Sequence, residues 1–332
     1  MDTINATPYA ELTPDAVLDA IESTGLKCDG RMLALNSYEN RVFQIWLEDE
    51  SLVVAKFYRP QRWSDEQILE EHAFVDELVE REIPVVAPLQ SPQGKSVSIF
   101  RNFRFAIYPK QGGRAPELDQ ANTLEWIGRF LGRIHAVGAT KPFDVRPQLN
   151  IETFGEEPRR YLLAGHFLPA DLTDAWSSVV DQALLGVRQC YERAGDVTQI
   201  RLHGDCHPGN ILWTEGGPHF VDFDDSRMGP AVQDLWMLLS GETPDMTRQF
   251  ADVLVGYEDF YEFNRRELHL IEALRTLRLI HYSAWIAQRW QDPAFPAAFP
   301  WFNTQRYWQD RILELREQIS LMGESSLAGI AF

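Results

Sequence analysis

The segment HGDCHPGN, His203 to Asn210, constrains the fold of this chain more than any other stretch, together with the acidic segment HFVDFDD that follows it. Apolar residues before the loop and the ILW, EGG and HFVDF segments after it indicate a short strand, a loop, a second strand, a turn and a third strand. Asp205, Asn210 and Asp222 stand at the ends of these strands and loops. We therefore expect three polar side chains to converge from two loop ends.

A carboxylate, an amide and a second carboxylate in this arrangement suit phosphoryl transfer from ATP. Transfer through a loose transition state needs a carboxylate that orients the attacking hydroxyl, and ligands that hold the cation neutralising the phosphates. Asp205 is the candidate for the catalytic carboxylate. Asn210 and Asp222 offer the oxygen ligands that Mg²⁺ prefers, with phosphate and water completing its shell. The pattern predicts an enzyme that uses ATP and Mg²⁺.

These residues resemble the catalytic loop of the aminoglycoside phosphotransferase and choline kinase group, whose fold is similar to that of eukaryotic protein kinases. The spacing from Asp205 to Asn210 equals that of the protein-kinase motif HRDxxxxN. Further stretches resemble the bacterial stress-response Ser/Thr protein kinases of this group: residues 35–45, 53–72, 201–213, 229–239 and 289–301. The resemblance implies an α+β, two-lobed, protein-kinase-like fold, with an antiparallel-sheet N-lobe over residues 1–108 and a mainly helical C-lobe over 109–332.

The N-terminal third is predicted to be a small antiparallel sheet with one helix. Strands are expected at 32–35, 41–47, 51–58, 97–100 and 103–108. A short helix after Thr13 and Pro14 precedes them, and a helix over 64–81 interrupts them. Ser64 and Gln67 fit a capping box at the start of that second helix.

Four residues of this part are candidate nucleotide contacts by the same resemblance. Lys56 in VVAKFY is expected to reach the phosphates, with Glu71 as its ion-pair partner and Glu70 as the alternative. The turn NSYEN replaces a glycine-rich loop, and Ser37 in it is the expected phosphate contact. The backbone near Tyr108 is expected to meet adenine. Taken alone, Lys56 reads more readily as a surface charge and the turn as an ordinary hairpin.

The rest of the chain is predicted to be mainly helical. Apolar residues at helical spacing from Ile127 to Val137 indicate one buried helix face. Further helices are expected at about 172–193, 231–241, 245–263, 267–290 and 304–320, with a long loop at 142–158. Aromatic residues near the C-terminus fit either a cage for a cationic ligand or ordinary packing, and packing is favoured.

Other residues of the catalytic segment allow more than one interpretation. His203 resembles the structural histidine of the kinase HxD motif and is expected to brace the loop against Asp234. Asp224 stands where protein kinases have the glycine of DFG, so it is expected to tune the metal site or to bind solvent. An alternative is a zinc site made of His203, Cys206, His207 and His219. Those four residues lack the usual pairwise spacing of zinc ligands.

Composition excludes several classes of protein. The chain of 332 residues has no apolar run near the roughly 20 residues of a membrane span, and no secretory signal at its N-terminus. Three cysteines without paired spacing indicate reduced thiols, so a cytoplasmic protein without membrane partners is expected. We also expect it to be a monomer. The net charge of −18 argues against nucleic-acid binding. It either steers basic partners or simply maintains solubility, and the second interpretation is favoured.

The resemblance to the stress-response kinases thus implies a protein kinase that acts in a stress response. Its expected acceptors are serine and threonine hydroxyls of proteins, including those of the enzyme itself. One alternative is a small-molecule kinase for an amino alcohol or an aminoglycoside, because both groups share the catalytic loop. Another is an inactive nucleotide-binding module, against which the joint presence of Lys56, Asp205, Asn210 and Asp222 argues.

Overall fold

The computed structural model describes residues 7–91 and 93–324, which divide into two compact units. The first unit comprises residues 1–116, 144–146 and 209–224, and the second comprises 117–143, 147–208 and 225–332. The lobe boundary between residues 108 and 109 stays a prediction.

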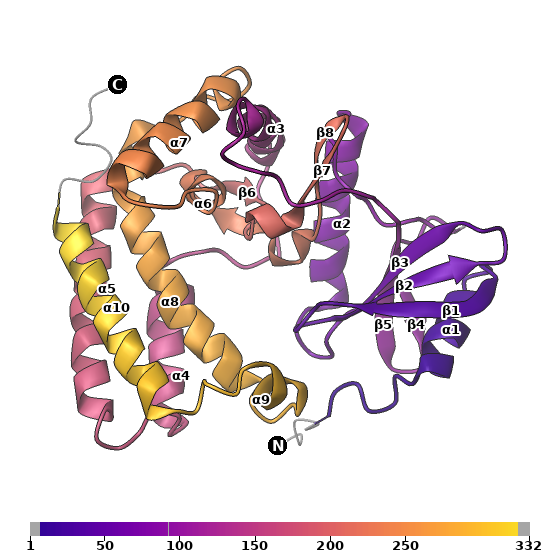
Figure 1. Ribbon diagram of the computed structural model, residues 1–332, viewed down its shortest axis with the longest axis horizontal. Helices are drawn as coiled ribbons and strands as arrows, with labels where there is room; N and C mark the ends of the chain where they lie inside the picture. Colours follow the sequence, from indigo (N-terminus) through magenta and orange to yellow (C-terminus); the bar gives the residue numbers. More distant parts are fainter. Residues whose placement is uncertain (1–6, 92, 325–332) are drawn as a thin grey trace. The chain divides into compact units, whose positions relative to one another are not determined.

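The first unit contains a five-stranded antiparallel sheet (Figure 1). Its strands are β1 (Cys28–Leu35), β2 (Arg41–Leu47), β3 (Leu52–Phe57), β4 (Ser98–Phe100) and β5 (Phe103–Pro109), in the order β1-β2-β3-β5-β4. Helix α1 (Pro14–Glu22) precedes the sheet, and α2 (Asp65–Glu80) lies between β3 and β4 in the sequence. The predicted antiparallel sheet with an intervening helix is confirmed.

The two faces of the sheet carry different side chains, because successive residues of a strand point to opposite faces. Val53, Ala55 and Phe57 of β3 pack in one apolar cluster with residues of α1. Lys56 lies between Ala55 and Phe57 in β3 and therefore projects from the opposite face. The alternation thus places a buried lysine on the face that α1 does not cover.

Local hydrogen bonds fix both helices where the sequence predicts. The Ser64 hydroxyl accepts from the Gln67 N–H at 3.2 Å, and the Gln67 side chain accepts from the Ser64 N–H at 3.0 Å, so the capping box is confirmed. The Thr13 hydroxyl caps α1 by accepting from the Ala16 N–H at 3.3 Å, with Pro14 at the first position of the helix. These caps satisfy N–H groups that a helix start leaves without partners.

A two-stranded hairpin completes the first unit. It consists of β7 (Ile211–Thr214) and β8 (Gly217–Phe220), which pair antiparallel. The Phe220 N–H donates to the Pro84 carbonyl at 2.8 Å, and the Val86 N–H donates to the Phe220 carbonyl at 3.2 Å. These bonds attach the hairpin to the segment that follows α2.

The second unit is mainly helical. Its helices are α3 (Thr123–Gly138), α4 (Glu157–Ala164), α5 (Thr173–Ala194), α6 (Val232–Trp236), α7 (Thr243–Tyr257), α8 (Ile271–Gln288), α9 (Ala294–Ala298) and α10 (Gln305–Gly323). A small sheet pairs β6 (Ile200–Leu202) with β9 (Arg227–Gly229). Helices α5, α8 and α10 run side by side (Figure 1). Within the described residues, no helix combines the length and apolarity needed to cross a membrane.

Helix α3 packs against α7 with its backbone unusually close. A Cβ atom at Gly128 would lie 2.0 Å from the Val253 carbonyl oxygen, and one at Gly132 would lie 2.4 Å from the Tyr257 carbonyl oxygen. Only glycine permits such an approach. The apolar stripe predicted from Ile127 to Val137 is confirmed as the buried face of α3.

Several local predictions for this unit were wrong or too long. The expected loop over 142–158 becomes helical at Glu152, where a π-helical turn (Glu152–Glu156) leads directly into α4. The Asn150 side chain starts this turn by accepting from the Thr153 N–H at 2.9 Å. The helix expected at 231–241 ends at Trp236, and the one expected at 267–290 begins as a 3-10 turn (Arg265–Leu270) before α8.

The C-terminal aromatic residues form a packed cluster in the second unit. Trp308 is fully buried and Tyr307 is 6% exposed, and their ring centroids lie 5.1 Å apart. Trp285 meets Phe295 edge to face, with centroids 5.1 Å apart. Trp301 stays 40% exposed at the margin. The packing interpretation is confirmed for the residues at the centre of this cluster.

Candidate active site

The loop after β6 is held by a buried carboxylate on α6. Asp234 Oδ2 accepts from the His203 N–H at 2.8 Å, and its Oδ1 accepts from the Gly204 N–H at 2.9 Å. The predicted brace between His203 and Asp234 is therefore present, and the backbone N–H of His203 contributes to it. The Asp205 N–H donates to His203 Nδ1 at 3.3 Å, which orders the next residue.

Gly204 is needed for the shape of this loop. Its φ is +87°, and a Cβ atom there would lie 2.2 Å from the carbonyl oxygen of Asp225. Both the backbone conformation and the close contact exclude a larger side chain. The glycine thus turns the chain sharply between the braced His203 and the candidate base Asp205.

Asp234 is ionised although it is fully buried. Burial alone would raise the pKa of its carboxyl, but the hydrogen bond with His135 and the nearby His203 and Gly204 N–H lower that pKa below its ordinary value. His135 Nε2 lies 3.1 Å from Asp234 Oδ2, and its Nδ1 lies 2.7 Å from the Tyr257 hydroxyl. A carboxylate that accepts several N–H groups is stable in its charged form.

A second buried acid supports α6 at its N-terminus. The Val232 N–H donates to Glu267 Oε2 at 2.8 Å, and Glu267 is only 3% exposed. Burial raises the pKa of Glu267 to about 7, although the bond from Val232 acts in the opposite direction. Glu267 therefore holds the helix that carries Asp234, and it does so in a protonation state that changes near neutral pH.

This burial predicts a pH-dependent gain in stability for Glu267→Gln. The folded-state pKa of about 7 exceeds the ordinary value of 4.5, so ionisation of Glu267 destabilises the folded state as pH rises between these values. Glutamine keeps an oxygen acceptor for Val232 and does not ionise. We expect the variant to exceed the wild type in free energy of unfolding by up to about 3 kcal/mol at pH 8, and by little at pH 5. Urea unfolding at both pH values measures this difference.

The control for this experiment is Glu192→Gln, because Glu192 is an exposed residue of α5. It should unfold with the same pH dependence as the wild type. A Glu267→Gln variant whose stability follows the wild type at both pH values would contradict the assignment.

Two side chains of the second unit lie beside the Asp205 carboxylate. Its Oδ1 lies 2.9 Å from Arg278 Nη2, and its Oδ2 lies 3.6 Å from His207 Nε2. The Asp205 side chain is 24% exposed, so it is accessible from solvent while being held in place. Arg278 comes from α8, far along the chain, and the sequence pattern gave no indication of this contact.

Lys56 lies in the first unit and contacts the predicted metal ligand directly. Its Nζ lies 2.8 Å from Asp222 Oδ1 and 3.8 Å from Asp224 Oδ1. Burial alone would lower the pKa of Lys56, but Asp222, with smaller contributions from its other acidic neighbours, holds that pKa well above the usual range. Tyr108 faces the same region, since Lys56 Nζ lies 5.7 Å from the centre of its ring.

Glu71 is placed differently from the sequence prediction. Its Oε2 lies 3.7 Å from Arg146 Nη1, and among the described residues the structure shows no ion pair between Glu71 and Lys56. Burial raises the pKa of Glu71 to about 7, against the lowering effect of Lys56 and Arg146. The alternative, Glu70, accepts from backbone N–H groups of residues 144–146, including that of Arg146 at 2.8 Å. Glu70 thus anchors a loop.

Asp224 is the centre of a network that sequence analysis did not foresee. Its Oδ2 accepts from Asn40 Nδ2 at 3.2 Å and forms a short ion pair with Arg62. Arg146 Nη2 donates to the Asp224 carbonyl at 2.5 Å. Asn40 also accepts from the Arg59 N–H at 3.1 Å. The acid at the DFG glycine position therefore ties the end of the NSYEN turn to the acidic segment.

Asn210 and Asp222 lie at the same end of the hairpin. Ile211 pairs with Phe220, and the Val221 N–H donates to the Asn210 carbonyl at 3.0 Å, so Asn210 and Asp222 flank this last pair. Asp222 has a φ of +62°, and its side chain is 51% exposed. An amide oxygen and an exposed carboxylate fit the few protein ligands that Mg²⁺ takes when it also binds phosphate and water.

Other metal arrangements find no support. In the part of the chain that the structure describes, no group of three or more His, Cys, Asp or Glu side chains is arranged to hold a metal ion. Cys206 is fully buried, and burial raises the pKa of its thiol well above the ordinary value. A thiol with a raised pKa is a poor metal ligand at neutral pH.

The structure thus brings only some of the predicted residues together. In the first unit, Lys56, Asp222 and Tyr108 lie close to one another, with Asn210 at the end of the same hairpin as Asp222. Ser37 is partly buried in the turn between β1 and β2. The catalytic candidate Asp205 belongs to the second unit.

Residues 32–271 match the phosphotransferase enzyme family. The chain belongs to this family. Stress response kinase A of Salmonella choleraesuis is 43% identical over 97% of both chains. The serine/threonine protein kinase RdoA of Salmonella typhimurium is likewise 43% identical over 97% of both chains, and stress response kinase A of Escherichia coli is 42% identical over the same shares. The chain is therefore a kinase, and the resemblance seen in its sequence is confirmed.

Solved structures confirm the predicted α+β, kinase-like fold. Amicoumacin kinase hAmiN, in complex with AMP-PNP, Ca²⁺ and Ami, superimposes with a TM-score of 0.72 at 21% identity, over 94% of both chains. A microcompartment-associated aminopropanol kinase gives a TM-score of 0.68 at 16% identity, over 93% of this chain and 97% of its own. At such identities the likeness concerns the fold alone.

Proposed function

We propose that this kinase transfers the γ-phosphoryl group of ATP to serine and threonine hydroxyls of proteins, including its own, in a cytoplasmic stress response. The observation that supports it most is Asp205, a partly exposed carboxylate in a loop whose backbone is fixed by the buried Asp234. A base held in this way loses little freedom when it orients a hydroxyl. The similarity to the stress response kinases extends over 97% of the chain and favours a protein acceptor.

Each candidate residue has a defined role in this proposal. Asp205 orients the acceptor hydroxyl and takes its proton as the new bond to phosphorus forms and the bond to the leaving ADP oxygen breaks. Lys56, cationic through its pairing with Asp222, binds phosphate oxygens. Asn210 and Asp222 hold Mg²⁺, which neutralises phosphate charge when bound. Four residues separate Asp205 from Asn210, so one continuous loop carries both roles.

The remaining nucleotide contacts follow from the sequence prediction. Ser37 in the NSYEN turn contacts phosphate, and the backbone beside Tyr108 binds adenine. The Ile107 carbonyl already accepts from the Leu89 N–H at 2.6 Å, which orders this end of β5. Glu71 acts on Lys56 through charge rather than through an ion pair, since it contributes to the raised pKa of that lysine. The predicted monomer belongs to the same proposal.

Incubation with γ-labelled ATP and Mg²⁺ tests the acceptor class. The wild type should label itself or a generic protein acceptor, and mass spectrometry should find phosphoserine or phosphothreonine that is absent with Asp205→Asn. A parallel panel contains aminopropanol and an aminoglycoside. Rapid labelling of either small molecule without any phosphoprotein would overturn the protein-kinase proposal in favour of the small-molecule alternative.

A further inference from the structure

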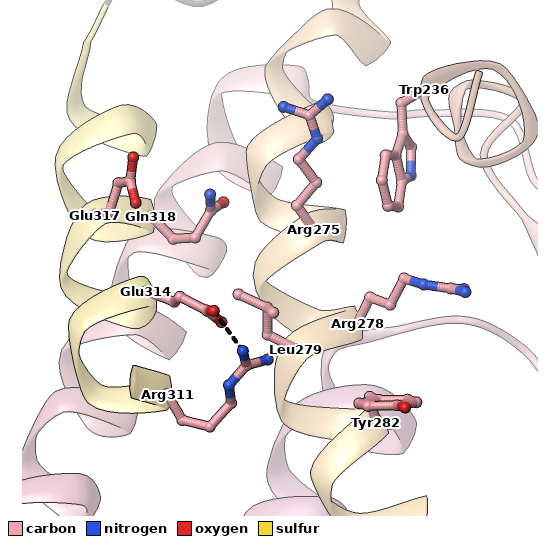
Figure 2. Close-up of a pocket in the computed structure, with 9 residues that line it drawn as sticks. All are labelled: Trp236, Arg275, Arg278, Leu279, Tyr282, Arg311, Glu314, Glu317 and Gln318. Atoms are coloured by element: carbon pink, nitrogen blue, oxygen red, sulfur yellow. Dashed lines mark hydrogen bonds and ion pairs between the residues drawn. The ribbon is translucent and has the colours of Figure 1, made fainter. Parts of the chain in front are cut away.

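A groove of about 480 Å³ lies within the second unit, between α8, α10 and the end of α6 (Figure 2). Its lining includes Trp236 and, from α8, Arg275, Arg278, Leu279 and Tyr282. The four residues of α8 in this set recur at the spacing of one helix face. Two of these four residues are arginines, so this face of α8 carries positive charge into the groove.

The charges of the groove are separated between its two sides. Glu314 and Glu317 both come from α10, where Glu314 forms an ion pair with Arg311 (Figure 2). The side formed by α8 and Trp236 presents Arg275 and Arg278 together with aromatic rings, and none of its lining residues is acidic. A ligand on this side therefore meets two guanidinium groups.

Both arginines of α8 have guanidinium N–H donors beyond the one that pairs with a carboxylate. Arg275 Nη1 pairs with Glu272 of its own helix at 2.9 Å, and its Nη2 donates to Met246 Sδ at 3.1 Å. Its guanidinium carbon lies 5.3 Å from the ring centre of Trp236. Arg278 extends from α8 between Trp236 and Tyr282, and its side chain is 42% exposed (Figure 2). A guanidinium has five N–H donors, so one carboxylate contact leaves others for a second oxyanion.

Arg278 connects the groove to the candidate base. Its Nη2 lies 2.9 Å from Asp205 Oδ1, within the same unit. An acceptor anion bound to Arg278 would therefore lie close to the carboxylate that takes the hydroxyl proton. A cationic acceptor would instead meet repulsion from Arg275 and Arg278, which is costly where solvent is partly excluded.

We propose that this groove receives the acceptor and that Arg275 and Arg278 bind a carboxylate beside the reacting hydroxyl, so that the preferred substrate is a serine or threonine in an acidic segment. The inference rests on the proposed protein-kinase function. The chain has a net charge of −18, which on its own would favour basic segments at long range. Salt screens such attraction over about 8 Å, whereas the two guanidinium groups act at contact distance.

Two serine peptides that differ only in having glutamate or lysine on both sides of the serine test this preference. We expect kcat/KM of the wild type to be at least about 10-fold higher for the glutamate peptide, since charge-assisted hydrogen bonds are stronger than neutral ones. Arg275→Glu should reverse the preference, and Arg275→Gln should reduce it. Arg306→Glu is the matched control, because Arg306 lies on α10 outside the groove with its side chain 91% exposed.

The outcomes distinguish failure of the acidic-acceptor inference from failure of the protein-kinase proposal. Phosphorylation of both peptides with a preference for lysine, or an unchanged ratio in both Arg275 variants, would overturn the acidic-acceptor inference and leave the protein kinase intact. Glycerate and aminopropanol serve as small acceptors of opposite charge. Labelling of glycerate without any peptide or protein would support the anion preference and overturn the protein-kinase proposal. Labelling of aminopropanol alone would overturn both.

Discussion

The substitution Asp205→Asn is expected to lower kcat by about 10²- to 10⁴-fold while ATP binding is retained. Asparagine has the shape of aspartate and keeps an oxygen for Arg278, which lies 2.9 Å from Oδ1 in the wild type. The loop backbone is held by Asp234 through the N–H groups of His203 and Gly204, so the fold of the loop should persist. The amide cannot accept the hydroxyl proton. Phosphopeptide formation measures the rate, and titration with a fluorescent ATP analogue measures binding.

Asp196→Asn is the control, since Asp196 is an exposed aspartate of the same unit. It should turn over at the wild-type rate. Near-normal turnover in Asp205→Asn would remove Asp205 from its proposed role. Loss of ATP binding together with activity would instead mean that the substitution disrupts the site as a whole.

The sheet of the first unit was predictable because its signals are local. Alternating apolar residues define β2 and β3, and the Ser64–Gln67 pair marks the start of α2. The catalytic loop was predictable for a related reason, since Asp205 and Asn210 are close in sequence. Such features depend on residues a few positions apart and can be recognised without the tertiary structure.

The contacts of the charged residues were not predictable, because they join distant parts of the chain. Glu71 pairs with Arg146, which belongs to a segment expected to be a long loop. Asp224 meets Asn40 and Arg62, which lie 184 and 162 positions away in the sequence. A residue type shows that a partner is needed when the side chain is buried, but it does not show which partner is reached. The prediction that Lys56 pairs with Glu71 therefore depended on the resemblance alone.

The prediction of helix boundaries in the second unit was wrong for a different physical reason. The segment from 142 to 158 is rich in polar residues and proline, which predicts a loop, yet the Asn150 side chain starts a helical turn at Glu152. Pro158 is the second residue of α4, and proline is tolerated in the first turn of an α-helix. The proline that suggested a loop is thus compatible with the helix.

Asp222→Asn is expected to lower kcat by about 10²- to 10³-fold and to raise the Mg²⁺ concentration needed for half-maximal activity, since holding a cation on the phosphates is worth several kcal/mol. Asparagine is chosen because Asp222 has a φ of +62°, a conformation that asparagine tolerates better than alanine. The change also removes the charge that holds the pKa of Lys56 high. Activity measured against Mg²⁺ concentration at fixed ATP gives both quantities.

The control for Asp222→Asn is Asp49→Asn, because Asp49 lies in the exposed turn between β2 and β3 and bonds only locally to Ser51 in the interactions that the structure gives for it. Its Mg²⁺ dependence should match the wild type. Asn210→Ala should shift the Mg²⁺ dependence in the same direction as Asp222→Asn, because both residues flank the Ile211–Phe220 pair at one end of the hairpin. Curves for both variants that superimpose on the wild type would show that the cation is held elsewhere, and the role of Asp222 would then be limited to pairing with Lys56.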